Sequence, residues 1–472
     1  MTEDTEYFES EDFKEILRQY EESVKSGEHI YMDADDLADI ADYYHYHNRN
    51  EEAEAAISLA MEYNPEAVGP MLYKAREALD AKDYETAENY ADKIQSADSL
   101  EAIYLRAEIL VLKKDIDEAD KILSEYSKDV PTDEYADFVK GVVELYLDYH
   151  QFMKAFEWIA RFKCSDSEGV KELMARTLFG LGKFKDSEKL FNELLDKNPY
   201  SADYWNALAG VQFMKADYNA ALTSSEYAIA IAPNDSDGFM SKANTLYTMG
   251  NYDEALVYYQ KYSEKAPDDE FGYLHQALCF INKAKFDEGL ELLKKAVSVS
   301  AVDSIYLPEI YQEMAFVYNK LGYLDKALWC LDMTDNLDCD HINLRVMRGH
   351  LLLTNKKNTE ARTEFEKALE QSDHASKTQL QIIISYQDNM YLDYAYRSFI
   401  EFFKTVDNSW NMGYSYMAQC CNDLKKDDEF LYYLKKACEC NPFEAEAVLG
   451  DFFPEDMDPK DYYDYALEHL KD

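Results

Sequence analysis

Basic residues are scarce in this chain of 472 residues, which has 48 lysines and arginines against 94 aspartates and glutamates and a formal net charge of −46. A polyanion repels phosphate groups, so we expect neither nucleic acid nor an anionic membrane as a partner. The chain is 47% hydrophobic and 14% aromatic, which is too apolar for an acidic disordered segment. We therefore expect a folded, acidic protein.

Long apolar runs are also missing. The most apolar stretch, Leu173–Gly182, is short and contains Arg176, whereas about 20 apolar residues are needed to cross a bilayer. The first residues, MTEDTEYFESED, have neither the positive charge nor the apolar core of an export signal. These absences predict a soluble protein that is not directed to secretion.

The eight cysteines lack the dense, regular spacing of a small disulfide-stapled domain, and most of them lie in the C-terminal half. Reduced thiols fit this pattern best. We expect a cytoplasmic protein.

Prolines are few, but three of them mark a period. Pro199, Pro233 and Pro267 follow one another at intervals of 34 residues, each after a stretch with helical periodicity. The unit between the first two carries small and large apolar residues at fixed places, namely Trp205, Leu208, Ala209, Gly210, Ala221 and Ala228. The next unit repeats the pattern with Phe239, Ala243, Leu246, Gly250, Ala255 and Tyr259. This self-similarity predicts an array of short helical hairpins.

The pattern has a physical reason. Two short helices that pack closely admit only Ala, Gly or Ser at their crossing point, and larger apolar side chains fill the space around it. Glycines such as Gly250 and Gly322 turn the chain between helices, and proline ends the second helix. Since a lone hairpin cannot bury its apolar face, neighbouring hairpins must stack.

This arrangement closely resembles the tetratricopeptide repeat family, and the resemblance extends over nearly the whole chain. It implies an all-α solenoid of helix-turn-helix repeats that forms a right-handed superhelix with a concave groove. About twelve repeats fit between Ala34 and Glu444 at this period.

We expect four segments along the solenoid. Residues 1–33 form an N-terminal capping region, 34–303 a first block of repeats, 304–444 a second block, and 445–472 a C-terminal capping helix. Extra residues at 301–307 mark a hinge candidate, although a slightly long loop in a continuous solenoid explains them as well.

Motifs that suggest chemistry have simpler structural explanations. Gly180-Leu-Gly-Lys183 lacks the glycine spacing and the following Ser or Thr of a phosphate loop, and it falls at a repeat turn. Cys420-Cys421 with Cys438 and Cys440, and His45 with His47, lie on helices where adjacent or alternate residues point apart. We expect no enzyme activity, no cofactor and no metal site.

In the tetratricopeptide repeat family the first helices line the groove, so the resemblance places partner binding on the residues between the packing positions of these helices. The candidates are Asp203, Asn206, Phe213, Asp237, Met240, Asn244, Tyr247, Phe271 and His275. Aromatic and Met side chains offer contact area, and Asn can hydrogen-bond a peptide backbone. The negative charge favours a protein or peptide partner with a basic face, although solubility alone also explains the acidity.

Three functions stay open at this point. The first is a scaffold or adaptor that binds a protein or peptide in the groove. The second is a constitutive structural subunit of a larger assembly. The third is an enzyme with an unrecognised site, for which the repeat pattern gives no support.

Overall fold

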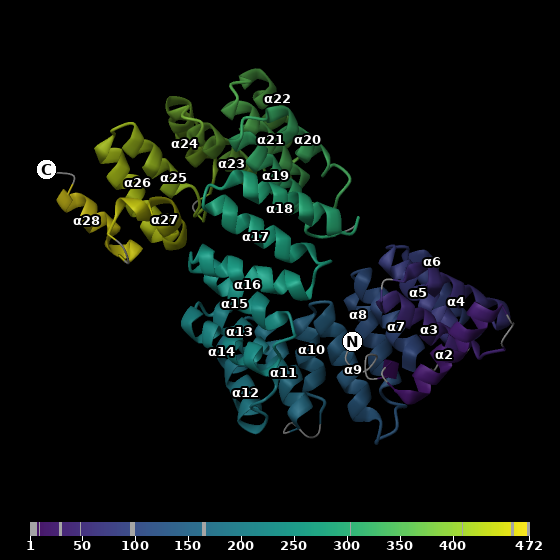
Figure 1. Cartoon of the computed structure of the whole chain (residues 1–472). Coiled ribbons are helices and arrows are strands. Elements are labelled where there is room, and N and C mark those ends of the chain that lie inside the picture. Colours follow the sequence, from purple (N-terminus) through teal and green to yellow (C-terminus); the bar gives the residue numbers. More distant parts are fainter. Residues whose placement is uncertain are drawn as a thin grey trace. The chain divides into compact units, whose positions relative to one another are not determined.

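The computed structural model describes most of the chain, namely residues 7–8, 10–27, 31–47, 49–94, 100–162, 167–302, 304–407, 409–454 and 457–469. All regular secondary structure in these ranges is helical, with no β-strand (Figure 1). The prediction of an all-α fold is confirmed.

From Ala34 to Cys440 the described residues form twelve consecutive helix pairs, and the two members of each pair pack against each other. The pairs are α3 (Ala34–Tyr46) with α4 (Asn50–Tyr63), α5 (Val68–Asp80) with α6 (Tyr84–Lys93), α7 (Leu100–Leu112) with α8 (Ile116–Tyr126), α9 (Tyr135–Asp148) with α10 (Phe152–Ile159), α11 (Glu168–Gly180) with α12 (Phe184–Lys197), α13 (Ala202–Met214) with α14 (Tyr218–Ile231), α15 (Asp237–Thr248) with α16 (Tyr252–Lys265), α17 (Glu270–Asn282) with α18 (Phe286–Val299), α19 (Leu307–Lys320) with α20 (Leu324–Asp332), α21 (His341–Thr354) with α22 (Asn358–Gln371), α23 (Ala375–Asp388) with α24 (Leu392–Thr405), and α25 (Tyr414–Asp423) with α26 (Asp427–Cys440). The chain is an all-helical repeat solenoid.

Small residues lie at the helix crossings, as the pattern predicts. Ala243, Ala255 and Ala277 are completely buried. Gly349 lies so close to the ring of Phe365 that an added Cβ would be 2.3 Å from a ring carbon. Close helix approach therefore explains why these positions lack larger side chains.

The turns inside the pairs share one backbone feature. In every pair from α5 and α6 onward, the second residue after the first helix has a positive φ, and these residues are Lys82, Lys114, His150, Gly182, Ala216, Gly250, Ala284, Gly322, Lys356, Met390 and Lys425. Glycine adopts this left-handed conformation without steric cost, whereas other residues lose roughly 1 kcal/mol or more. The turn geometry is thus set by the helix pair and imposed on whichever residue occupies the position.

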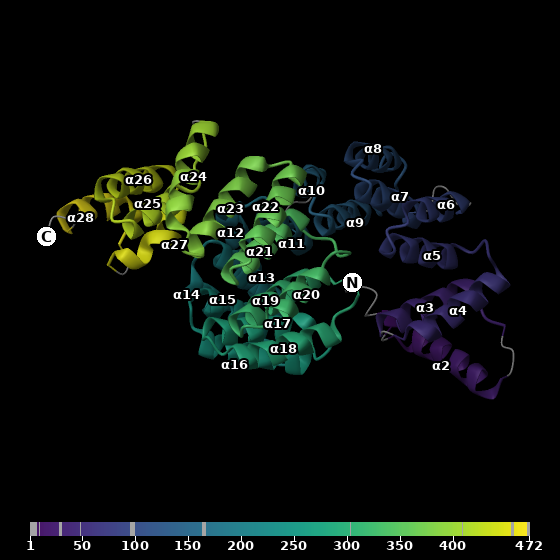
Figure 2. The same cartoon turned by 90° about the horizontal axis from the view of Figure 1, so that it is seen from above.

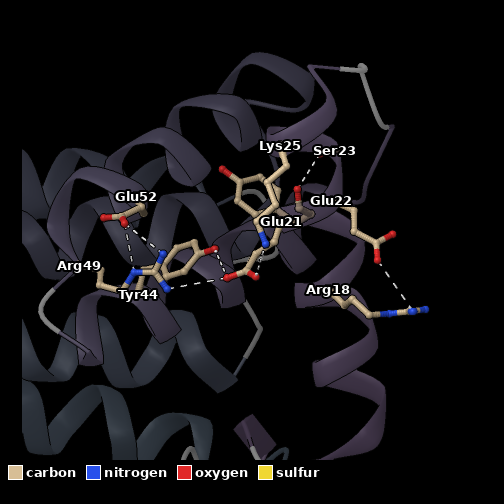
Figure 3. Close-up of polar contacts among 9 residues, drawn as sticks. Arg18, Glu21, Glu22, Ser23, Lys25, Tyr44, Arg49 and Glu52 are labelled. Carbon is tan, nitrogen blue, oxygen red and sulfur yellow. Dashed lines mark hydrogen bonds and ion pairs between the residues drawn. The ribbon is translucent and has the colours of Figure 1, made fainter.

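The N-terminal helix α2 (Glu11–Ser26) covers the first pair (Figure 2). It buries Phe13 and Tyr20 in one hydrophobic cluster with α3 and α4. At its edge Glu21 accepts a hydrogen bond of 3.3 Å from the Tyr44 hydroxyl and lies 3.8 Å from the Arg49 guanidinium (Figure 3). The predicted capping helix is therefore held by apolar burial and by a charged contact.

The C-terminal end has two helices where one capping helix was predicted. The first, α27 (Pro442–Leu449), packs on α25 and α26, and α28 (Tyr462–His469) packs on α26. The Glu444 carboxylate accepts hydrogen bonds of 3.0 Å from the backbone N–H of Gly413, at the N-terminus of α25. A carboxylate there complements the helix dipole and ties α27 to the last pair.

The chain divides into two compact units, Met1–Ile231 and Ala232–Asp472. The predicted boundary between repeat blocks at residues 303 and 304, with its hinge candidate at 301–307, lies inside the second unit, and residue 303 falls outside the described residues. Here α17, α18, α19 and α21 contribute to one hydrophobic cluster. The block division and the hinge stay predictions.

Among the described helices, none combines the length and the apolar character that crossing a membrane requires.

Candidate functional site

The candidate site lies on the first helices α15, α17 and α19 of the second unit. On α15 the predicted residues Asp237, Met240, Asn244 and Tyr247 recur every three or four positions, so they share one helix face. Asp237 is exposed and the other three are half-buried. The helix therefore presents a mixed polar and apolar strip at its surface.

Asn244 contributes to the core of its own repeat. Its side-chain oxygen accepts a hydrogen bond of 2.7 Å from the hydroxyl of Tyr259, a residue of α16 that is completely buried. Burial raises the pKa of Tyr259 strongly, so its hydroxyl stays protonated and donates. Removing the Asn244 amide would leave a buried donor without its partner, so this residue stabilises the helix pair whether or not it touches a ligand.

On α17, Phe271 and His275 form a continuous aromatic wall. Their ring centroids are 3.9 Å apart, and Nδ1 of His275 lies 3.0 Å from the carbonyl oxygen of Phe271. Burial lowers the pKa of His275, so the imidazole favours its neutral form. Tyr306, just before α19, meets Phe271 edge to face at 5.6 Å and extends this wall.

Tyr247 connects α15 with the next first helix, α17. Its hydroxyl oxygen accepts a hydrogen bond of 2.8 Å from the side-chain amide of Asn282 at the end of α17. The pKa of Tyr247 is raised chiefly by burial, and the negative charge of Glu313 on α19 adds to the shift. Tyr247 thus ties α15 to the next first helix, α17.

Two carboxylates of α19, Glu309 and Glu313, were not among the predicted site residues. Glu309 is exposed and Glu313 is half-buried. Partial burial raises the pKa of both carboxyl groups, and the charge of Glu309 raises the pKa of Glu313 further. The sequence offers a signal for them, because they are spaced four residues apart and no lysine or arginine lies within four positions of either one. In a chain with 94 acidic residues this signal is hidden by abundance.

The other three predicted residues belong to α13 in the first unit. Asp203 is exposed, and Phe213 is half-buried against the ring of Tyr218 at 5.8 Å. Asn206 is half-buried, and its side-chain oxygen is buried without a hydrogen-bond partner among the described residues. The nine candidates therefore divide into three in one unit and six in the other.

The structure places the remaining motifs at structural positions. Gly180 ends α11 and Lys183 precedes α12, so the glycine-rich segment is a repeat turn. His47 packs against Tyr43 and Tyr46, with ring centroids 4.5 and 5.2 Å away. Within the part of the chain that the structure describes, no group of three or more His, Cys, Asp or Glu residues is arranged to hold a metal ion.

Comparison with known families agrees with the repeat pattern. Tetratricopeptide repeat models match residues 78–140, 173–236, 237–269 and 342–373. Together with the helix pairs, these matches show that the chain belongs to the tetratricopeptide repeat family. No curated protein sequence matches the chain.

Solved structures of similar architecture have low sequence identity to this chain. The crystal structure of yeast Tom70 aligns with 93% of this chain and 96% of its own, at 14% identity and a TM-score of 0.45. One chain of the crystal structure of the APC/C hetero-tetramer Cut9-Hcn1 aligns over 90% of its length with 89% of this chain, at 15% identity and a TM-score of 0.36. A tetratricopeptide protein of Thermus thermophilus aligns with 40% of this chain and all of its own, at 24% identity and a TM-score of 0.33.

Proposed function

We propose that the protein is a non-catalytic scaffold or adaptor that binds a protein or peptide partner on its first helices. The observation that carries this proposal is the contact between side chains of consecutive first helices. Tyr247 of α15 accepts a hydrogen bond from Asn282 of α17, and the aromatic wall of Phe271 and His275 on α17 is extended by Tyr306, just before α19. Large aromatic side chains provide contact area at low entropic cost, and polar groups between them fix the position of a ligand.

A basic partner suits this surface best. The net charge of −46 attracts a positively charged polypeptide over a distance and penalises acidic competitors. The half-buried carboxylate of Glu313 on α19 adds a local preference for positive charge. Nucleic acid is negatively charged, as the protein is, so electrostatic repulsion disfavours it as a partner.

A non-catalytic role in the cytoplasm is supported by the family and by the cysteines. The seven described cysteines are free thiols, and four of them are completely buried. Burial raises the pKa of Cys279 and Cys330 to about 12, so neither forms a reactive thiolate near neutral pH. Buried free thiols are typical of a reducing compartment.

The test is affinity capture of the tagged full chain from its native lysate at low and at high salt, followed by mass spectrometry. We expect one basic protein that is retained at low salt and lost at high salt. The variant that combines Met240→Ala with Tyr247→Ala should lose it, whereas Val257→Ala, an exposed position on the second helix α16, should retain it.

Two outcomes would contradict the adaptor. A partner that survives high salt in fixed stoichiometry and tolerates both first-helix substitutions would identify a constitutive structural subunit. Absence of any specific partner would remove the proposal's basis. We avoid Asn244→Ala in this test, because the loss of its hydrogen bond to Tyr259 would destabilise the helix pair.

A further inference from the structure

The second helix α10 is shorter than the second helices of the next pairs. It has eight residues, whereas α12, α14 and α16 have fourteen each. A cavity of about 570 Å³ lies beside the C-terminal end of α10, between the first helices α9 and α11. These three helices pack against one another within the first unit (Figure 1).

The early end of α10 explains the cavity. At the corresponding place after α16, Tyr262 of the last helical turn lies close to Gly272, near the start of the next first helix. A Cβ added at Gly272 would be 2.8 Å from a ring carbon of Tyr262. A Cβ added at Gly169, near the start of α11, would meet nothing within 4 Å. A longer second helix fills this place with side chains, and α10 leaves it open.

Apolar side chains make up much of the cavity lining. Val170 and Leu173 of α11 are buried, and Val130, Tyr135 and Phe162 add further apolar surface. Small-molecule sites in proteins typically have volumes of roughly 300 to 1,000 Å³ and a mainly apolar lining with a few polar groups. The cavity is therefore suited to the apolar part of a small ligand.

Arg161 lines this cavity and has no counter-charge among the described residues. Its guanidinium carbon lies 3.5 Å from the centroid of the Trp158 ring, and both terminal nitrogens lie 3.3 Å from the Ser124 hydroxyl oxygen. These contacts fix the planar group, and no described carboxylate forms an ion pair with it. The other charged residues of the lining, Lys140 and Asp137, have opposite signs, so the lining carries a net positive charge.

A second cavity shows the opposite arrangement. It has a volume of about 460 Å³ and lies beside the C-terminal end of α20, which has nine residues. Its two arginines are already paired, because Arg348 donates a hydrogen bond of 2.5 Å to Asp332 and Arg345 donates one of 3.2 Å to Glu364. There the protein supplies its own anions, whereas the described residues supply none to Arg161.

We propose that the cavity between α9 and α11 binds a small amphiphilic anion, namely an apolar chain that ends in a carboxylate. The chain lies against Val170 and Leu173, and the Arg161 guanidinium binds the carboxylate, because its planar donors match the two oxygens. The net charge of −46 repels anions at a distance, so binding depends on this local cation and on apolar contact. This inference goes beyond the adaptor role and does not depend on it.

The test is isothermal titration calorimetry of the full chain with decanoate at about 0.15 M salt, where long-range repulsion is largely screened. We expect one decanoate to bind per chain with a dissociation constant below about 1 mM. Octanoate is shorter by two methylene groups and should bind roughly tenfold more weakly, because less apolar surface is buried.

Two variants separate the apolar and the charged contributions. Gly169→Leu places a side chain in the open space and should weaken decanoate binding at least about tenfold. It should melt no lower than the wild type, because leucine favours the helix more than glycine does. The matched control Gly210→Leu, on α13, makes the same change where an added Cβ also meets nothing within 4 Å, and should alter the affinity less than about twofold.

Arg161→Met should weaken decanoate binding at least about tenfold, because the charge-assisted hydrogen bonds are lost. The preference of this variant for decanoate over octanoate should stay roughly tenfold, which shows that its apolar cavity is intact. The matched control Arg176→Met removes the same charge from an exposed position on α11 and should change the affinity less than about twofold.

Absence of saturable decanoate binding below about 1 mM would overturn the proposal, and so would equal losses in Gly169→Leu and Gly210→Leu or in Arg161→Met and Arg176→Met. If decanoate does not bind and Gly169→Leu abolishes capture of the protein partner, the cavity holds a polypeptide side chain instead and the proposal is wrong.

Discussion

Alanine should have opposite effects at two helical glycines of the first unit. At Gly141 in α9, an added Cβ would lie 2.4 Å from the hydroxyl oxygen of Tyr104, whereas at Gly210 in α13 it would meet nothing within 4 Å. Tyr104 cannot move away freely, because its hydroxyl donates a hydrogen bond of 2.9 Å to the carbonyl oxygen of Phe138 and its ring stacks on Phe138 at 5.9 Å.

The magnitudes decide the sign at each position. Replacing glycine by alanine inside a helix stabilises it by roughly 0.8 to 1.0 kcal/mol. At Gly141 the overpacking costs about 1 to 3 kcal/mol, and displacing Tyr104 loses a hydrogen bond worth about 1 kcal/mol. After the gain in helix propensity is subtracted, the net effect is a destabilisation of about 1 to 3 kcal/mol. At Gly210 the helix propensity acts alone and stabilises.

Hydrogen exchange measures both effects locally, because the helix pairs of a repeat protein open separately. Gly141→Ala should speed amide exchange in α9, and Gly210→Ala should slow it in α13. Adding Tyr104→Phe to Gly141→Ala should recover about 1 kcal/mol in a double-mutant cycle. Slower exchange in α9 upon Gly141→Ala would refute the steric argument.

Further predictions concern the turns, the C-terminal end and the α19 carboxylates. Gly322→Ala, at a φ of 83°, should lower the unfolding free energy by about 1 kcal/mol. Ala284→Gly, at a φ of 55°, should change it by less than about 0.5 kcal/mol, because the relief of backbone strain and the added entropy of the unfolded chain nearly cancel. Urea unfolding measures both changes. Glu444→Gln should speed amide exchange in the first turn of α25, at a cost of about 0.5 to 1 kcal/mol. Because partial burial raises the pKa values of Glu309 and Glu313 in the folded state, their charges cost stability at neutral pH. The variant that combines Glu309→Gln with Glu313→Gln should therefore unfold at a higher temperature than the wild type at about pH 7.5. The two melting temperatures should converge as the pH falls to the ordinary glutamate pKa of about 4.3 and below.

The repeat architecture is readable from the sequence because each hairpin is a local unit. The 34-residue spacing from Pro199 to Pro267, the small residues at crossings and the turns at Gly250 and Gly322 follow from contacts within one repeat or with its neighbour. Methionine disfavours a positive φ, so the residue type at Met390 gives no sign of this conformation. Only the position of Met390 within the repeat predicts it.

The roles of the surface residues depend on contacts between helices, which spacing alone does not determine. Asn244 accepts a hydrogen bond from Tyr259 of the neighbouring helix, so a position predicted for ligand binding also stabilises the core. Glu313 influences Tyr247, 66 residues earlier in the chain, and the sequence gives no means to tell this carboxylate from the many solvated ones. The resemblance to the family predicts which helices form the binding face, and side-chain partners decide which of their residues remain available for a ligand.

Hydrogen exchange of the full chain with and without the partner recovered by affinity capture tests the central claim most directly, because it locates the bound polypeptide. The account predicts slower exchange confined mainly to the first helices α15, α17 and α19, and no such change in the variant that combines Met240→Ala with Tyr247→Ala. Protection of the second helices instead, or equal protection in the variant, would contradict it.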